Sequence, residues 1–251
     1  MALVRRLATR AGFTITRVGK ATAIPHAVDA ADAEILKTVM PFSVAGPWRL
    51  LAVIDAARHV VRHGIEGAFV ECGVLRGGAT MAAALAFLDE GTTDRDIHLF
   101  DTFEGMPAPT DADFKRRTGI SAKEILEGRR RVGVHGSDWA MAPESEVRGN
   151  LARVPYPPDR IHFTKGLVEE TIPEAAPDRI AVLRLDTDFY ESTRHELQEL
   201  VHRVSPHGVV LIDDYGSWDG ARRAVDEFLA GSDRPFFLQR TDADGRAFVV
   251  P

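Results

Sequence analysis

Two pairs of acidic residues follow two short aliphatic segments of the chain. Asp186 and Asp188 come after residues 180–185, and Asp213 and Asp214 come after residues 208–212. Both segments have the length and composition of buried strands, and the helical stretch between them predicts that these strands are parallel neighbours. The carboxyl ends of parallel strands meet at one edge of a sheet, so we expect the four carboxylates to gather there.

Carboxylates gathered in this way favour binding of a cation. Within about 4–6 Å of one another they raise each other's pKa and oppose ionisation, and a hard divalent ion removes that conflict. A ligand set made only of oxygen atoms favours Mg²⁺, Mn²⁺ or Ca²⁺ over zinc. The alternative is that each aspartate only caps the following helix or opens a turn. We favour the metal because one cap cannot employ two acids at both strand ends.

A glycine-containing turn after residues 67–72 is a second candidate site. Its spacing is Glu-x-Gly-x-x-x-Gly-Gly, from Glu71 through Gly73 to Gly77 and Gly78, whereas dinucleotide-binding turns have Gly-x-Gly-x-x-Gly. Glu71 would repel a pyrophosphate and attract an ammonium group, and Asp101, after the strand expected at 97–100, would accept hydrogen bonds from ribose hydroxyls. A cationic nucleoside without phosphate, such as S-adenosylmethionine, fits these groups. The alternative is a tight strand-to-helix connection with an incidental acid.

The rest of the sequence predicts the elements that position these residues. Strand-like and helical segments alternate from residue 67 onwards, after two helices that form an N-terminal cap. We expect helices at 29–40, 48–63, 79–89, 145–154, 168–174, 192–204 and 220–230, and strands at 67–72, 97–100, 161–164, 180–185, 208–212, 236–240 and 247–250. The turn at 242–245 indicates a hairpin. The expected fold is an α/β, doubly wound sheet whose last strand is antiparallel.

Two segments lie outside this alternation. Residues 104–143 are too long and too polar for an ordinary connection, so we expect a mobile lid over the ligand, with Trp139 and Met141 as its apolar contacts. A disordered surface insertion is the alternative. Residues 1–20 carry five basic residues and no acid. For this arm we expect a surface helix that packs on its own or a neighbouring subunit.

Composition restricts the partners and the compartment. A net charge of -6 disfavours nucleic acid as a partner, since phosphate binding uses clustered Lys and Arg, and we expect a small-molecule substrate instead. Cys72 is the only cysteine, so no intrachain disulfide can form and the cytoplasm is the simpler compartment. We expect Cys72 to be buried in its strand. No apolar run approaches the roughly 20 residues that span a bilayer, so no membrane partner is expected.

Four motifs between about residues 30 and 240 resemble the macrocin O-methyltransferase family, whose members methylate sugar hydroxyls of macrolides, aminocoumarins and related natural products. The motifs are FVECGVLRGGA at 69–79, FDTFEGMP at 100–107, LRLDTDFYEST at 183–193 and VLIDDYG at 210–216. In the lid the resemblance rests on residues 137–140 alone. It implies a Rossmann-like class I methyltransferase domain in residues 67–251, with the lid at about 104–143, after an N-terminal arm and helical cap in residues 1–66.

The resemblance also implies roles for individual residues. Asp188 would be the general base, and Asp186, Asp213 and Asp214 would hold Mg²⁺ (or Mn²⁺), although the residues alone leave open which of Asp186 and Asp188 is base and which is ligand. S-adenosylmethionine would be bound by Glu71, Gly73, Arg76, Gly77, Gly78, Thr80, Asp101, Thr102, Phe103, Ser137, Asp138 and Trp139.

The expected protein is therefore a cytoplasmic, homo-oligomeric enzyme of antibiotic biosynthesis. It would use S-adenosylmethionine and Mg²⁺ to methylate a sugar hydroxyl of a glycosylated natural product. Two alternatives stay open on the residues: a metal-dependent methyltransferase of catechols or other phenols, and a catalytically silent cofactor-binding protein.

Overall fold

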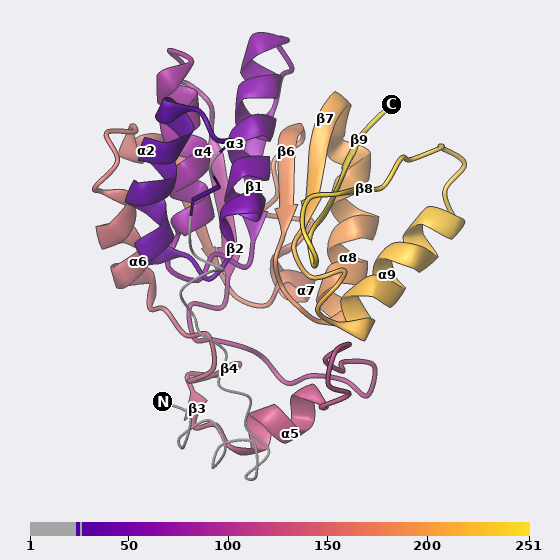
Figure 1. Cartoon of the computed structure of the whole chain (residues 1–251). Coiled ribbons are helices and arrows are strands. Elements are labelled where there is room, and N and C mark those ends of the chain that lie inside the picture. The colour runs from indigo at the N-terminus through magenta and orange to yellow at the C-terminus, as the bar shows by residue number, and fades with distance from the viewer. Residues whose placement is uncertain (1–23, 26) are drawn as a thin grey trace, which may run out of the picture.

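Segments rich in Val, Ile, Leu and Phe form the centre of the structure. The computed structural model describes residues 24, 25 and 27–251, and its main sheet has the strand order β5-β2-β1-β6-β7-β9-β8 (Figure 1). The first five strands in this order are parallel, and β9 runs antiparallel to both β7 and β8. This confirms the doubly wound α/β sheet with an antiparallel last strand. The strands are β1 (Ala68–Cys72), β2 (Ile97–Asp101), β5 (Ile161–Lys165), β6 (Ile180–Leu185), β7 (Val204–Ile212), β8 (Gln239–Arg240) and β9 (Arg246–Val249).

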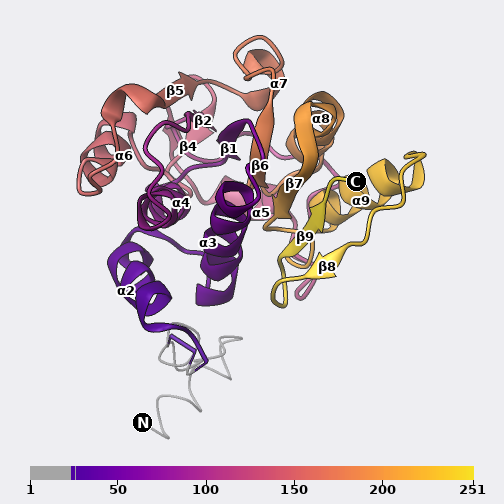
Figure 2. The same cartoon turned by 90° about the horizontal axis from the view of Figure 1, so that it is seen from above.

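Helices cover both faces of the sheet, which is why its central strands are apolar on both sides (Figure 2). On one face Leu36 and Ile54 share a core with Phe69 and Val182, so the N-terminal helices are part of the main core. On the other face Val70 and its neighbours form a second core. The first face has α2 (Ala30–Val39), α3 (Pro47–Arg62), α4 (Gly78–Asp89) and α6 (Glu144–Leu151), and the second has α7 (Val168–Thr171), α8 (Tyr190–Leu200) and α9 (Asp219–Ala230).

The direction of winding reverses between β1 and β6. From β1 the chain adds β2 and β5 on one side, whereas β6 and β7 lie on the other, and ligands of such sheets bind at the carboxyl ends beside this reversal. The two strands meet closely there, because a Cβ atom on Gly73, whose φ is 82°, would lie 2.1 Å from the Asp186 carbonyl oxygen. A glycine is therefore required at position 73.

Residues 104–143 fold across this carboxyl edge (Figure 1). They contain α5 (Ala122–Glu127) and a two-stranded ribbon of β3 (Arg131–Val132) and β4 (Gly136–Ser137). The segment is docked by the buried side chain of Asp113, which accepts hydrogen bonds from Tyr190 N at the start of α8 and from Thr110 N within the segment. The described segment is thus packed on the start of α8.

Several boundaries differ from those that the sequence predicts. The strand expected at 236–240 is only Gln239–Arg240, and β7 begins at Val204, before the expected residue 208. The helix expected at 168–174 ends at Thr171, because Pro173 disfavours a helical conformation at the preceding residue. The predicted arm at residues 1–20 lies outside the described residues. Among those described, no helix is both long and apolar enough to cross a membrane.

Candidate active site

The acids predicted from the strand ends line one cavity of about 470 Å³. Asp186 and Asp188 follow β6, and Asp213 and Asp214 follow β7. Gly73, after β1, and Asp101, at the end of β2, line the same cavity. The predicted gathering of these residues at the carboxyl edge is therefore confirmed.

Asp188 is held by the indole ring of Trp218. Trp218 Nε1 donates a hydrogen bond of 2.5 Å to Asp188 Oδ1, and Trp218 is itself buried between Phe189 and Trp139. Burial raises the pKa of Asp188 to about 6, the Asp186 charge adds to the rise, and hydrogen bonds with Asp214 and Trp218 oppose it. The backbone of Asp188 has a φ of 65°, a conformation that costs most residues about 1–2 kcal/mol and persists where the surroundings enforce it.

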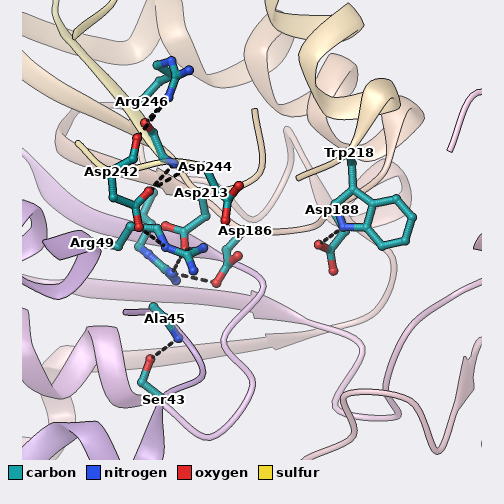
Figure 3. A network of polar contacts seen from close by, with 12 residues as sticks. Ser43, Ala45, Arg49, Asp186, Asp188, Asp213, Trp218, Asp242, Asp244 and Arg246 are labelled. Atoms are coloured by element: carbon teal, nitrogen blue, oxygen red, sulfur yellow. Dashed lines mark hydrogen bonds and ion pairs between the residues drawn. The ribbon is translucent and has the colours of Figure 1, made fainter. Parts of the chain in front are cut away.

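Asp186 and Asp213 face two arginines. Arg184 Nη2 lies 2.6 Å from Asp186 Oδ2 and 2.9 Å from Asp213 Oδ2, while Arg49 Nη1 lies 2.9 Å from Asp213 Oδ2. Burial raises the pKa of Asp186, Arg184 lowers it, and the neighbouring acids raise it again. In Figure 3, Asp188 points to Trp218, apart from the group around Arg49. Within the shared cavity, Asp186 and Asp213 are thus held by arginines, whereas Asp188 is held by Trp218.

The donor set has the chemistry of a site for a hard divalent cation. Within the described residues Asp214 Oδ2 is buried and has no hydrogen-bond partner, so an acceptor is left for an ion. Burial raises the pKa of Asp214, as do Asp188 and Asp213, and a bound cation would oppose that effect. In residues 24, 25 and 27–251, however, no three His, Cys, Asp or Glu side chains form a group that could hold a metal. Binding by Asp186, Asp213 and Asp214 would require the first two to turn away from Arg184.

The two acids expected to bind the nucleoside have different positions. Asp101 lines the cavity, and its carboxylate accepts hydrogen bonds from the backbone N–H groups of Val74, Leu75 and Phe103. It therefore shapes the glycine turn as well as facing the ligand space. Glu71 does not line the cavity: it is fully buried, 2.5 Å from Arg184 Nη1 and hydrogen-bonded to Thr80 Oγ1. Burial raises the pKa of Glu71, and Arg184 opposes the rise.

The other residues expected at the cofactor divide into two groups. Thr102 and Trp139 line the cavity with Gly73 and Asp101. The rest do not line it. Arg76 is paired with Glu146, Gly77 and Gly78 pack on α6 and the turn at 42–43, and Phe103 packs at a tilt against Phe163. Thr80 donates a hydrogen bond to Glu71, Ser137 donates one to the Met106 carbonyl, and Asp138 accepts one from Arg130 N. Met141 was expected as an apolar contact of the lid, and this is wrong: its side chain lies at the surface, outside the cavity.

Sequence reasoning missed three residues that shape the site. Arg49 is on α3, far from the acidic residues in the sequence, and lines the same cavity. Lys115 belongs to the lid and also lines the cavity, with its Nζ 4.2 Å from the centre of the Trp218 ring. Arg184 belongs to the quoted strand motif, but a residue in a strand buried on both faces has no periodicity that says where it points. The signal that could have identified Arg184 is a single charged residue within an otherwise aliphatic strand, two positions before Asp186. Cys72 is buried, as predicted.

Comparisons of this chain with known proteins agree with the resemblance of its sequence motifs. Residues 28–248 match the family model described as "Macrocin-O-methyltransferase (TylF)". A Streptomyces olivaceus protein named 8-demethyl-8-(2,3-dimethoxy-alpha-L-rhamnosyl)-tetracenomycin-C 4'-O-methyltransferase is 35% identical over 170 residues, 67% of this chain and 60% of that protein. A Streptomyces niveus protein named demethyldecarbamoylnovobiocin O-methyltransferase is 31% identical over 204 residues, 81% of this chain and 73% of that protein.

Solved structures agree with these matches. The O-methyltransferase NovP has a TM-score of 0.71 and 28% identity, over 83% of this chain and 82% of its own. CalS11, a calicheamicin methyltransferase, has a TM-score of 0.62 and 18% identity, over 93% of this chain and 99% of its own. The second similarity concerns the fold alone.

Proposed function

Because the chain belongs to the macrocin O-methyltransferase family, we propose that it transfers a methyl group from S-adenosylmethionine to a sugar hydroxyl of a glycosylated natural product, with the help of Mg²⁺ or Mn²⁺. The single observation that carries this proposal is the presence of Asp186, Asp188, Asp213 and Asp214 in one cavity with the glycine turn at Gly73. The name of the Streptomyces olivaceus relative contains a rhamnosyl group, which favours a glycoside as substrate.

Asp188 is the proposed general base. It lines the cavity, and its Oδ1 is fixed by Trp218. A sugar hydroxyl is too weakly acidic to react unaided near neutral pH, and a positioned base contributes about 10²- to 10⁴-fold to such a reaction. As the hydroxyl oxygen bonds to the methyl carbon, the bond from that carbon to the sulfonium sulfur breaks, S-adenosylhomocysteine leaves, and Asp188 takes the hydroxyl proton. Lid residues Met106 and Trp139 line the same cavity, where they would exclude water.

Asp186, Asp213 and Asp214 are the proposed metal ligands. A bound divalent ion would stabilise the anion of a substrate hydroxyl and so lower its pKa. The unpartnered Asp214 Oδ2 supports this role, and Arg184 and Arg49 balance the remaining charge. Gly73, Asp101, Thr102 and Trp139 are the proposed direct contacts of S-adenosylmethionine. Glu71 and the other residues around the glycine turn would shape that pocket from behind.

Substitution of Asp188 tests the proposal. We expect Asp188→Asn to keep its affinity for S-adenosylmethionine in calorimetry but to lose about 10²- to 10⁴-fold in turnover, since it removes a positioned base. Turnover is measured by mass spectrometry, as the gain of one methyl group by candidate glycosides. Asp233→Asn, at an exposed residue, is the matched control. Unchanged turnover of Asp188→Asn would exclude Asp188 as the base.

Removal of divalent ions tests the metal separately. We expect EDTA to abolish turnover and added Mg²⁺ or Mn²⁺ to restore it. Full turnover in EDTA would remove the metal from the mechanism and leave the methyl transfer itself in place. The cytoplasmic location and the homo-oligomer stay predictions of the sequence.

A further inference from the structure

A second cavity, of about 650 Å³, shares no lining residue with the active-site cavity. We call it the side groove. One wall is α3, with Trp48, Leu51 and Asp55, and the floor is the face of the sheet formed by β7 and β9, with Val209 and Val249. Figure 2 shows β9 and β8 extending beyond α3. On their other face the same strands are packed by Phe228 and Leu229 of α9.

The side groove has an exposed apolar rim. Trp48, Phe237 and Val249 expose 51%, 81% and 49% of their surface. Sheets of this doubly wound kind are normally covered on both faces, and an apolar patch of several large side chains marks an interaction surface. A further segment of polypeptide is therefore expected to lie here.

The groove also carries negative charge on its helical wall. Asp29, Asp32 and Asp55 line it, with Arg240 on the opposite wall. Asp32 pairs with Arg58, but Asp55 forms no ion pair within the described residues. Partial burial raises the pKa of Asp55, the neighbouring Asp32 carboxylate adds to the rise, and the Arg58 and Arg62 charges oppose it without reversing it. An occupant with positive charge would relieve this repulsion.

The N-terminal residues 1–20 have a composition that complements the acidic and apolar side groove. Residues 1–20 contain five basic residues and no acid, interspersed with Leu3, Val4, Leu7, Phe13 and Ile15. Ala27 and Val28 line the groove, so the chain before them starts from its rim. Twenty residues span about 30 Å even as a helix, so residues 1–20 are long enough to extend along the side groove. We propose that the side groove binds residues 1–20 of the same chain, with apolar side chains on Trp48, Phe237 and Val249 and basic ones toward Asp29 and Asp55.

Trp48 is a built-in reporter for this contact. Of the other two tryptophans, Trp218 is 1% exposed and Trp139 is half-buried, so acrylamide quenching reports mainly on Trp48. We expect Trp48 to be shielded in the full chain. Substitution of Arg5→Glu, Arg6→Glu and Arg10→Glu together should increase quenching and shift the emission to the red. Salt at ~1 M, which shortens the screening length to about 3 Å, should have the same effect.

Two further variants make the assignment specific. With Trp48→Phe in both backgrounds, the difference between the native and triple-variant arms should vanish. Asp55→Asn should increase Trp48 quenching, whereas Asp159→Asn, an exposed acid beside β5 at the other end of the sheet, should not. Equal quenching of the native chain and the triple variant would overturn the proposal. Shielding that disappears on dilution would assign the groove to the arm of a second copy and would also overturn it.

Discussion

At the scale of single residues, the site depends on how each carboxylate is held. Asp188 receives its hydrogen bond from Trp218 Nε1 and has a left-handed backbone. Asp186 and Asp213 are instead held by Arg184, whose guanidinium also reaches Glu71. Burial opposes the charge of Arg184, but Asp186, Asp213 and Glu71 raise its pKa well above the ordinary value. The buried guanidinium of Arg184 therefore fixes three carboxylates, whereas Asp188 is held by a neutral donor, the N–H group of Trp218.

Replacement of the neutral donor should reduce turnover. Trp218→Phe keeps an aromatic ring against Phe189 and Trp139 but removes the N–H group that Asp188 accepts. Loss of a hydrogen bond to a charged group costs about 1.5–3 kcal/mol, so we expect kcat to fall by about 10- to 100-fold. The KM for S-adenosylmethionine should hardly change. Steady-state kinetics check this, with Trp48→Phe as the control for loss of an indole, and an unchanged kcat would contradict the positioning role of Trp218.

At the scale of elements, the lid and α8 depend on one another. The N-cap residue of α8, Phe189, has no side chain that can cap the helix, and Asp113 from the lid accepts the hydrogen bond of Tyr190 N at 2.8 Å. A Cβ atom on Gly220 would lie 2.2 Å from Asp113 Oδ1, so α9 leaves room for this contact. The lid thus caps α8 through an acid, which is also favourable beside the positive end of a helix.

Removal of this acid should loosen the lid. Asp113→Ala leaves Tyr190 N and Thr110 N without their partner, at a cost of about 1–3 kcal/mol. We expect faster hydrogen exchange and proteolysis within residues 104–143, and a higher KM for the acceptor. Asp111→Ala is the matched control in the same segment, since Asp111 exposes 94% of its side chain and forms an ion pair with Lys123. Equal exchange in the two variants would show that Asp113 does not anchor the lid.

The elements that the sequence predicts are recognised from residues close together in the chain, whereas the features it does not predict depend on contacts between residues far apart in the chain. Residues 180–185 and 208–212 are short aliphatic runs, and such runs identify buried strands locally, so the acids after them could be placed at one edge. The lid has no such local pattern, since Asp113 caps a helix that begins 77 positions later. The position of Met141 was predicted wrongly because it too depends on contacts with distant parts of the chain. Likewise Glu71 and Arg184 meet only because β1 and β6 are paired. Contacts across the sheet decide these positions, and no local pattern records them.

At the scale of the whole molecule, the stability of the fold depends on the protonation of a histidine pair, which lies at the end of the sheet away from the hairpin. His98 on β2 and His162 on β5 are register partners, with ring centres 4.6 Å apart. Burial lowers the pKa of His98 to about 4, the neighbouring His162 lowers it further, and Asp96 opposes the change. Protonation of His98 is thus disfavoured in the folded state.

The fold should therefore lose stability as the pH falls from 6.5 to about 4. The unfolded chain protonates His98 near its ordinary pKa of 6.5 and the folded chain only near 4, so the unfolded state binds more protons within this window and unfolding is favoured as pH falls. Because the ring is partly exposed, solvent screening reduces the effect to about 1 kcal/mol. Urea unfolding at pH 7 and pH 5 should show a smaller loss for His98→Gln than for the native chain. His202→Gln, at an exposed histidine, should retain the full loss, and identical pH dependence in all three would exclude His98 as its source.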